Sequence, residues 1–454
     1  MSNIENNFSY NNIFIKLNEI FKNLEVDIKN DIYNINKIKT RNGKISFTDA
    51  LINKLKYSEL GITKLNLISE YNFNNSSSVS RTTFYEKEKL IPLITYENIF
   101  NKISNLYKEL INKKTNIIAV DGTFNNTNIL NKKGNLETTL NMGYFDVENN
   151  IVIDLTLNGY ENKNYEILQL TNYIKKNNLN NVILILDRAY SSYEFINYLH
   201  NNNINYIIRF KNNSKNYKDR IINFKDTRVI KYQQIIEKEV FNKNYGNSSD
   251  GFKHKSVILE YLNNYTVVTN LKLEDYNDDS IKELYKKRWS VEIFFKLLKY
   301  NFKFEKIIEY NKEKNDISYK KLYLCNLIII YLAEIIEKIN QNTKKKEFIN
   351  LMKPNKSNTI KGIFKTLEFI IKSKLTLEIL KNISNNYVTY VKIKKGLNND
   401  RISKTPFTKW YVKGYHNKGY DNLIVESLLK KDTSLLNKNI KLKYNKSRIK
   451  QINI

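Results

Sequence analysis

One stretch of the chain combines residue types that could hold a metal ion beside a phosphate backbone. Tyr285, Arg288, Glu292 and Lys299 fall in a segment whose apolar spacing predicts a helix. At roughly 100° of rotation per residue, the four lie within about 60° of arc along the edge of an apolar face. A strip with one carboxylate, two cations and a phenol suits such a site. The ordinary alternative is a solvated helix face that carries an i, i+4 ion pair.

Two more carboxylates stand where buried strands are expected to end. Asp121 follows the apolar run 116–120, and Asp187 follows the stronger apolar run 181–186. Ligand sites of α/β sheets form at the carboxyl ends of strands. For either aspartate alone, a turn or a helix cap is the ordinary interpretation. Together with Glu292 they predict a two-metal phosphoryl-transfer site, because carboxylates bind Mg²⁺ and two ions can clamp the attacking and leaving oxygens.

These motifs resemble those of DDE transposases of the insertion-sequence-four type. The Tyr-x2-Arg-x3-Glu-x6-Lys signature of that family is met without deviation by Tyr285, Arg288, Glu292 and Lys299. Its Asp-Arg-x-Tyr motif is met by Asp187, Arg188 and Tyr190, and the segment that begins at Asp121 has its Asp-Gly-Thr form. The resemblance covers roughly residues 80 to 340, and its most specific part is the Tyr-Arg-Glu-Lys spacing.

The resemblance implies cut-and-paste DNA transposition by an endonuclease and polynucleotidyl transferase. Such an enzyme cleaves DNA strands at transposon ends and transfers them into target DNA, with two Mg²⁺ ions for which Mn²⁺ can substitute. The catalytic and metal-binding residues are then Asp121, Asp187 and Glu292. The residues expected to contact DNA are Tyr285, Arg288, Lys299, Arg188, Trp289 and Arg81.

Three of these DNA-binding assignments have open alternatives. Arg188 could contact a phosphate or pair with a carboxylate. Trp289 falls off the apolar face, so it could stack on an extruded base or pack on the β insertion expected over about 204–272. Arg81 belongs to residues 75–87, where capping residues lead into a basic segment. That pattern predicts a helix-turn-helix with Arg81 and Lys87 on DNA, or a plain loop and surface helix.

The partners implied are double-stranded DNA, both transposon ends and target, and a second copy of the chain in a synaptic homodimer. A net charge of +29 agrees with a nucleic-acid partner. The abundance of Asn, Ile, Lys and Tyr indicates AT-rich codon bias, which explains part of the lysine excess. Only nine arginines are present, and Arg188 and Arg288 both stand beside predicted catalytic acids.

Two other functions stay open at this point: a transposon-derived DNA-binding protein without transposition activity, and a related DNA nuclease that never joins strands. The single cysteine, Cys325, excludes a disulfide framework. The most apolar stretch, 322–336, contains Asn326 and Glu334 and is too short and polar to span a bilayer. We therefore expect an intracellular, DNA-associated protein, in the cytoplasm or nucleoid of a prokaryote, or otherwise in a nucleus or viral factory.

The order of expected elements indicates an α/β fold with an RNase H-like core and helical N- and C-terminal regions. Residues 113–345 form the catalytic domain, whose first and fourth strands lie side by side and bring Asp121 and Asp187 together. Short alternating segments over about 204–272 predict an inserted antiparallel β-sheet with a hairpin loop at 242–254. Residues 1–112 form a helical DNA-binding region. Residues 346–454 form a helical region for dimerisation or DNA contact, in which 410–420 suits base stacking or an interface.

Overall fold

The computed structural model describes residues 9–38, 40, 43–111, 116–130, 136–157, 166–177, 179, 182–210, 227–241, 256–304 and 312–393. The predicted hairpin loop at 242–254 and the aromatic and basic segment at 410–420 lie outside the described residues. Within the described part, no helix is long and apolar enough to cross a membrane.

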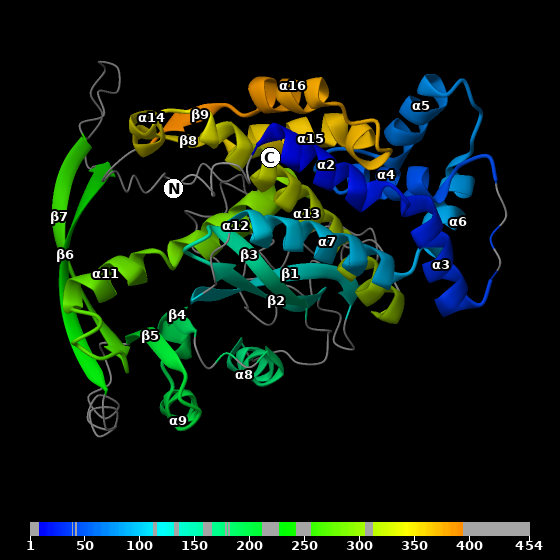
Figure 1. The fold of residues 1–454 in the computed structure, drawn as a ribbon. Coiled ribbons are helices and arrows are strands. Elements are labelled where there is room, and N and C mark those ends of the chain that lie inside the picture. The colour runs from blue at the N-terminus through cyan, green and yellow to red at the C-terminus, as the bar shows by residue number, and fades with distance from the viewer. Residues whose placement is uncertain are drawn as a thin grey trace, which may run out of the picture.

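A seven-stranded mixed sheet forms the centre of the fold, with strand order β3-β2-β1-β4-β5-β7-β6 (Figure 1). An antiparallel meander makes up one half: β1 (Ile117–Leu130), β2 (Leu136–Asp146) and β3 (Ile151–Leu157). Strands β4 (Ile183–Leu186) and β5 (Asn205–Phe210) then run parallel to β1. Strand β1 therefore lies beside β4, as the sequence predicted for the strands that carry Asp121 and precede Asp187.

The insertion is antiparallel, as predicted, but it is not a sheet of its own. The short segments expected over 227–269 are instead parts of two long, continuous strands, β6 (Arg228–Phe241) and β7 (Ser256–Thr269). Strand β7 pairs with β5, so the insertion extends the central sheet. The apolar alternation is interrupted at Gln233 and Asn264, which are partners in the ladder. Backbone pairing continues through this polar pair of residues, and hydrophobic pattern alone cannot show this.

Helices cover both faces of the sheet, as Figure 1 shows. Strand residues of odd number, such as Ile117 and Ile185, pack with α7 (Leu93–Ile111), α12 (Trp289–Asn301) and α13 (Lys312–Asn342). Residues of even number, such as Ile118 and Leu184, pack with α8 (Glu166–Asn177) and α9 (Tyr193–Asn201). Alternate side chains of a strand point to opposite faces, so both faces of β1 and β4 are buried.

Seven of the helices that follow pack on α13 or on one another, and the eighth, α14, contacts the short strand β8. These helices are α2 (Tyr10–Phe21), α3 (Leu24–Asn36), α4 (Phe47–Tyr57), α5 (Lys64–Asn74), α6 (Arg81–Leu90), α14 (Lys346–Leu351), α15 (Lys356–Ile371) and α16 (Leu377–Tyr387). The described C-terminal part also contains a small β pair, β8 (Met352–Pro354) with β9 (Tyr390–Lys392). One apolar cluster runs from Ile13 through the sheet to Val388. The division into three domains stays a prediction, and this core crosses both of the predicted boundaries.

Candidate active site

Asp121 lies within β1 and not at its end, as was wrongly expected, because pairing with β2 continues through the polar residues that follow. Ile117 and Ala119 point toward α12 and α13, and Asp121 follows them at the same two-residue period. Its Oδ1 accepts a hydrogen bond of 2.9 Å from the Gly122 backbone N–H. The carboxylate is therefore presented on the α12 face of the sheet.

Asp187 follows the last residue of β4, at the carboxyl end of that strand. It caps a short 3₁₀ helix, η1 (Arg188–Tyr190), and its Oδ1 accepts a 2.6 Å hydrogen bond from the Ala189 backbone N–H. Asp187 therefore does act as a helix cap, which was named above as the ordinary interpretation of such an aspartate. Because β1 and β4 are parallel neighbours, both aspartates reach the same region, and the negative charge of Asp187 raises the pKa of Asp121.

The segment from Tyr285 to Lys299 is not one continuous helix, and that expectation was wrong. Helix α11 (Asp278–Lys286) ends in a tight turn at Lys287 and Arg288, after which α12 begins. In this turn the N–H of Arg288 bonds to the carbonyl of Tyr285 at 3.1 Å, three residues back rather than four. The rotation per residue is larger in such a turn than in an α-helix. The angles calculated at about 100° per residue for Tyr285 to Lys299 are therefore not valid across this turn.

Strand β6 of the insertion holds the start of α11 in place. Arg228 donates hydrogen bonds to the Tyr276 carbonyl at 2.7 Å and to the Leu271 carbonyl at 3.1 Å, and it pairs with the Asp278 carboxylate. The Tyr232 hydroxyl donates to the Asp278 carbonyl at 2.5 Å. The insertion therefore fixes the helix that leads into Arg288.

Arg288 joins the acidic residues of two different elements. Its Nη2 lies 2.5 Å from Glu292 Oε1, and its Nη1 lies 3.7 Å from Asp121 Oδ2. The guanidinium also donates a hydrogen bond to the buried Tyr285 hydroxyl. Arg288 is only 9% exposed. The i, i+4 ion pair named as the ordinary alternative is thus present, but it is largely buried and linked to the sheet.

Burial changes the ionisation of Asp121. It raises the pKa of the carboxyl to about 7, and the Arg288 charge and the Gly122 N–H only partly oppose that effect. The negative charges of Asp187 and Glu166 raise the pKa further. A carboxylate surrounded by other carboxylates in a partly dry site is stabilised by any added cation.

Glu166 is a fourth carboxylate at this site, and the sequence reasoning did not find it. It is the first residue of α8, and its negative charge acts on Asp121. An acidic residue in the first turn of a helix is common because it favours the helix dipole. Glu166 approaches Gly122 and Tyr190 in the structure. Only a sequence motif that includes these residues could have identified Glu166, and the sequence contains none.

Comparison with known proteins agrees with this geometry. Residues 112–322 match the family model described as a transposase DDE domain. A relative from Synechocystis sp., described as a transposase for insertion sequence element IS4SA, is 32% identical over 130 residues. Residues 112–322 form a DDE transposase domain of the insertion-sequence-four type. The match to that relative spans 27% of this chain and 34% of the relative's length.

One solved structure similar to this chain is a piggyBac transposase synaptic complex with hairpin DNA. The identity is 10% and the TM-score 0.39, over 87% of this chain and 89% of that chain. A TM-score below 0.5 does not establish a common fold, so nothing further follows from this neighbour.

The other residues predicted to contact DNA differ in how far they are exposed to solvent. Trp289 is 54% exposed, so it is not buried against the insertion, and Arg288 and Lys296 flank its ring at 5.7 and 5.8 Å from the centroid. Arg188 is exposed beside Asp187. Lys299 lies half-buried near the end of α12, about two turns beyond Glu292.

The helix-turn-helix prediction is only partly supported. Ser80 caps α6 by accepting a hydrogen bond from the Thr83 N–H, and Arg81 is exposed in the first turn. Lys87, however, was wrongly expected on DNA. Its ammonium donates to the Ile45 carbonyl and lies 4.4 Å from the centroid of the Phe47 ring, inside the helical region. Position within a basic segment does not reveal that a lysine is used internally.

The acids of the transposase domain have the chemistry for divalent cations but are not gathered around one point. Among the described residues, no three Asp, Glu, His or Cys side chains lie close enough together to hold a metal ion. Arg288 instead contacts both Asp121 and Glu292. The donor set still fits, because all the groups are hard carboxylate oxygens and Asp121 is in a site with unbalanced negative charge.

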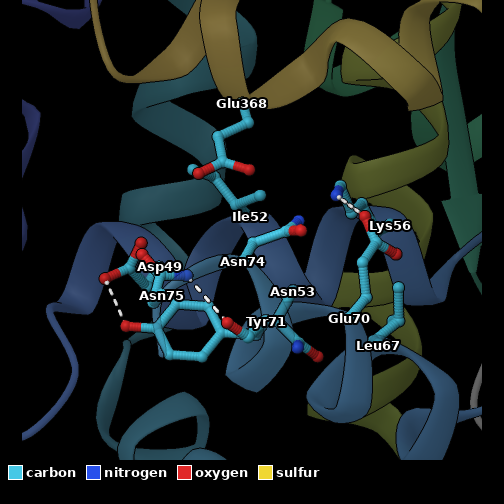
Figure 2. Close-up of a pocket in the computed structure, with 10 residues that line it drawn as sticks. All are labelled: Asp49, Ile52, Asn53, Lys56, Leu67, Glu70, Tyr71, Asn74, Asn75 and Glu368. Atoms are coloured by element: carbon cyan, nitrogen blue, oxygen red, sulfur yellow. Dashed lines mark hydrogen bonds and ion pairs between the residues drawn. The ribbon is translucent and has the colours of Figure 1, made fainter. Parts of the chain in front are cut away.

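A pocket in the helical region is separate from this site (Figure 2). It lies between α4 and α5, with Glu368 of α15 over it. The Tyr71 hydroxyl donates to Asp49 at 3.3 Å, and the Lys56 ammonium pairs with Glu70 at 2.9 Å. Several of its charged groups are thus already paired with one another, and its lining comes from none of the elements that carry the acids.

Proposed function

We propose that this chain is a metal-dependent transposase, which cuts DNA strands at transposon ends and transfers the freed ends into target DNA. The observation that carries the proposal is the link through Arg288 between Asp121 of β1 and Glu292 of α12, beside Asp187. These are the three acids that the transposase signature selects, and they come from three separate elements.

The strand order supports an RNase H-like core within this proposal. Strands β1, β2 and β3 form an antiparallel meander, and β4 and β5 are added parallel to β1 on its other side. Helix α8 connects the meander to β4. This order puts the segment of β1 that contains Asp121 beside the carboxyl end of β4, which is what a site built on Asp121 and Asp187 requires.

In the proposed mechanism, Asp121, Asp187 and Glu292 hold two Mg²⁺ ions, or Mn²⁺ in their place. The bound ions supply activation of a water or 3′-hydroxyl and stabilisation of the leaving oxygen. The chain's own residues orient the DNA. Burial of Asp121 below α12 keeps the carboxylate partly dry, and charge interactions are stronger in such an environment.

Arg288 is the residue best placed to bind the scissile phosphate. A guanidinium that bridges two carboxylates has the fork geometry for two phosphate oxygens as well. Its Nε is buried and has no hydrogen-bond partner in the described part of the chain, so one donor is still available. Tyr285, Lys299, Arg188 and Trp289 are proposed to contact the DNA around it.

The proposed partners are double-stranded transposon ends, target DNA and a second copy of the chain in a synaptic homodimer. Arg81, exposed on α6, is proposed to contact DNA away from the acids. The large positive charge favours association with DNA and makes it dependent on salt.

Cleavage of labelled duplexes tests the proposal directly. The duplexes would carry the inverted repeats that flank the coding sequence, incubated with the full chain and Mg²⁺. We expect the wild type to cut at the repeat ends and Glu292→Gln to be at least about 10²-fold slower, because one carboxylate ligand is lost. The matched control is Glu283→Gln, an exposed acid on α11 that pairs with Lys286 at 2.5 Å.

The outcomes separate the remaining functions. Equal cleavage by Glu292→Gln and the wild type would contradict the three-acid mechanism. Binding of the repeats without cleavage, in both Mg²⁺ and Mn²⁺, would favour a transposon-derived DNA-binding protein. Cleavage without any strand transfer would favour a nuclease.

A further inference from the structure

Glu166 reaches the acidic site from the opposite face of the sheet to Arg288 and Glu292. It begins α8, which packs on the face formed by Ile118 and Val120. Gly122 continues that face by the two-residue period of the strand. A Cβ atom added at Gly122 would lie 2.5 Å from Glu166 Oε1 and 2.8 Å from its Cδ. The carboxyl group of Glu166 therefore fills the space that a side chain at position 122 would need, directly beside Asp121.

Tyr190 holds Glu166 in this position. Tyr190 is fully buried, and a side-chain hydrogen bond links its hydroxyl to the Glu166 carboxylate, with Met142 Sδ as a weaker acceptor at 3.9 Å. It also ends η1, the short helix that Asp187 caps. The same turn thus positions Asp187 directly and Glu166 through the tyrosine, so the two carboxylates keep a fixed relation to each other.

The charges at this site are not balanced among the described residues. Asp121, Asp187 and Glu166 act on one another as negative neighbours, and Arg288 is the cation that faces Asp121. Arg288 also pairs with Glu292, and its buried Nε lacks an acceptor in the described part of the chain. The excess negative charge of the carboxylates points to a bound cation that is missing. The unpaired Nε–H of Arg288 points to a bound anion that is missing.

We infer that Glu166 is a fourth acidic residue of the cation-binding site, placed next to Asp121 through the gap at Gly122 and held by Tyr190. The inference rests on the proposed metal-dependent function. It assigns Glu166 to strengthening the binding of divalent cations by Asp121 and Asp187.

Mn²⁺ binding to the full chain without DNA tests the inference independently of catalysis. Free Mn²⁺ would be followed by electron paramagnetic resonance during titration of wild type, Glu166→Gln, Asp121→Asn and Glu194→Gln. Glu194→Gln is the matched control, because Glu194 is an exposed acid in the first turn of α9, on the same face of the sheet. We expect Glu166→Gln to bind Mn²⁺ about 10-fold to 100-fold more weakly, and Glu194→Gln to stay within about twofold of wild type.

Tyr190→Phe provides a second variant that keeps the buried ring and removes only the hydroxyl. We expect it to weaken Mn²⁺ binding in the same direction as Glu166→Gln, and circular dichroism would confirm that both variants are folded. Unchanged Mn²⁺ affinity in Glu166→Gln, with a large loss in Asp121→Asn, would overturn the inference and leave the proposed function in place. Absence of Mn²⁺ binding by the wild type would overturn both.

Discussion

Asp121 shows at the scale of one residue how a proposed catalytic site opposes folding. Its carboxyl is mostly buried, and Asp187 and Glu166 add negative charge that Arg288 does not fully offset. A group arranged in this way costs stability in its ionised form. Proteins retain such groups where binding or catalysis requires them.

We expect Asp121→Asn to make the metal-free protein more stable at pH 8. The folded pKa of about 7 lies above the ordinary 3.8, so between these values the folded state holds a proton that the unfolded chain has lost. The free energy of unfolding of the wild type therefore falls as pH rises through that window. Removing the charge should restore about 1–3 kcal/mol at pH 8, partly offset by loss of the Arg288 contact, and almost nothing at pH 4.

Urea denaturation in the presence of a chelator measures this difference at both pH values. Asp275→Asn, at an exposed aspartate, is the control and should show no such pH-dependent gain. A variant less stable than wild type at pH 8 would show that the Arg288 contact outweighs the burial of the charge.

At the scale of elements, the close approach of α12 to β2 determines how near Glu292 lies to the sheet. Gly143 of β2 is the register partner of Asp121. A Cβ atom at Gly143 would lie 2.8 Å from Phe295 Cζ and 3.3 Å from Val291 Cγ2. The helix therefore rests on the strand where the strand has no side chain, and Glu292 comes within reach of Arg288 and Asp121.

Gly143→Ala is expected to lower the free energy of unfolding by about 1–3 kcal/mol, because the added methyl overlaps buried side chains of α12. Urea denaturation measures the change. Gly43→Ala serves as control, since its added Cβ would meet only the Lys87 ammonium at 3.6 Å, an ordinary contact. If Gly143→Ala matched the wild type, α12 would have room to move away from the sheet at little cost.

At the scale of the whole molecule, the terminal helices and the sheet share one core. Tyr96, Ile103 and Tyr107 of α7 are buried with the apolar residues of α13. On the other side of α13, Lys356 of α15 pairs with buried Glu334 and lies 3.8 Å from Glu337. Removing either set of helices would expose apolar surface and leave buried charges without partners.

We therefore expect residues 113–345 alone not to fold into a native monomer. Each large apolar side chain that loses its burial costs about 1.5–3 kcal/mol, and several together exceed the usual net stability of about 5–15 kcal/mol. Sedimentation velocity and binding of a hydrophobic dye, compared with the full chain, would show aggregation and exposed apolar surface. Cooperative unfolding of a monomeric fragment would instead support the predicted domain boundaries as folding boundaries.

The sequence by itself was sufficient for the features that are encoded locally. Apolar runs marked the buried part of β1 and the end of β4, so Asp121 and Asp187 could be named, although β1 continues past Asp121 to Leu130. The signature spacing named Arg288 and Glu292. These patterns depend on neighbours a few residues away, which a sequence displays directly. The adjacency of β1 and β4 followed from the order of elements.

Only the tertiary structure decided the features that depend on contacts between distant segments. Glu166 reaches Asp121 across a sheet, Lys87 is used internally, and β7 joins β5 instead of forming a separate sheet. The break between α11 and α12 and the core shared with the terminal helices belong to the same class. Such contacts are set by packing and by backbone pairing across the fold, and neither leaves a period or a motif in the local sequence.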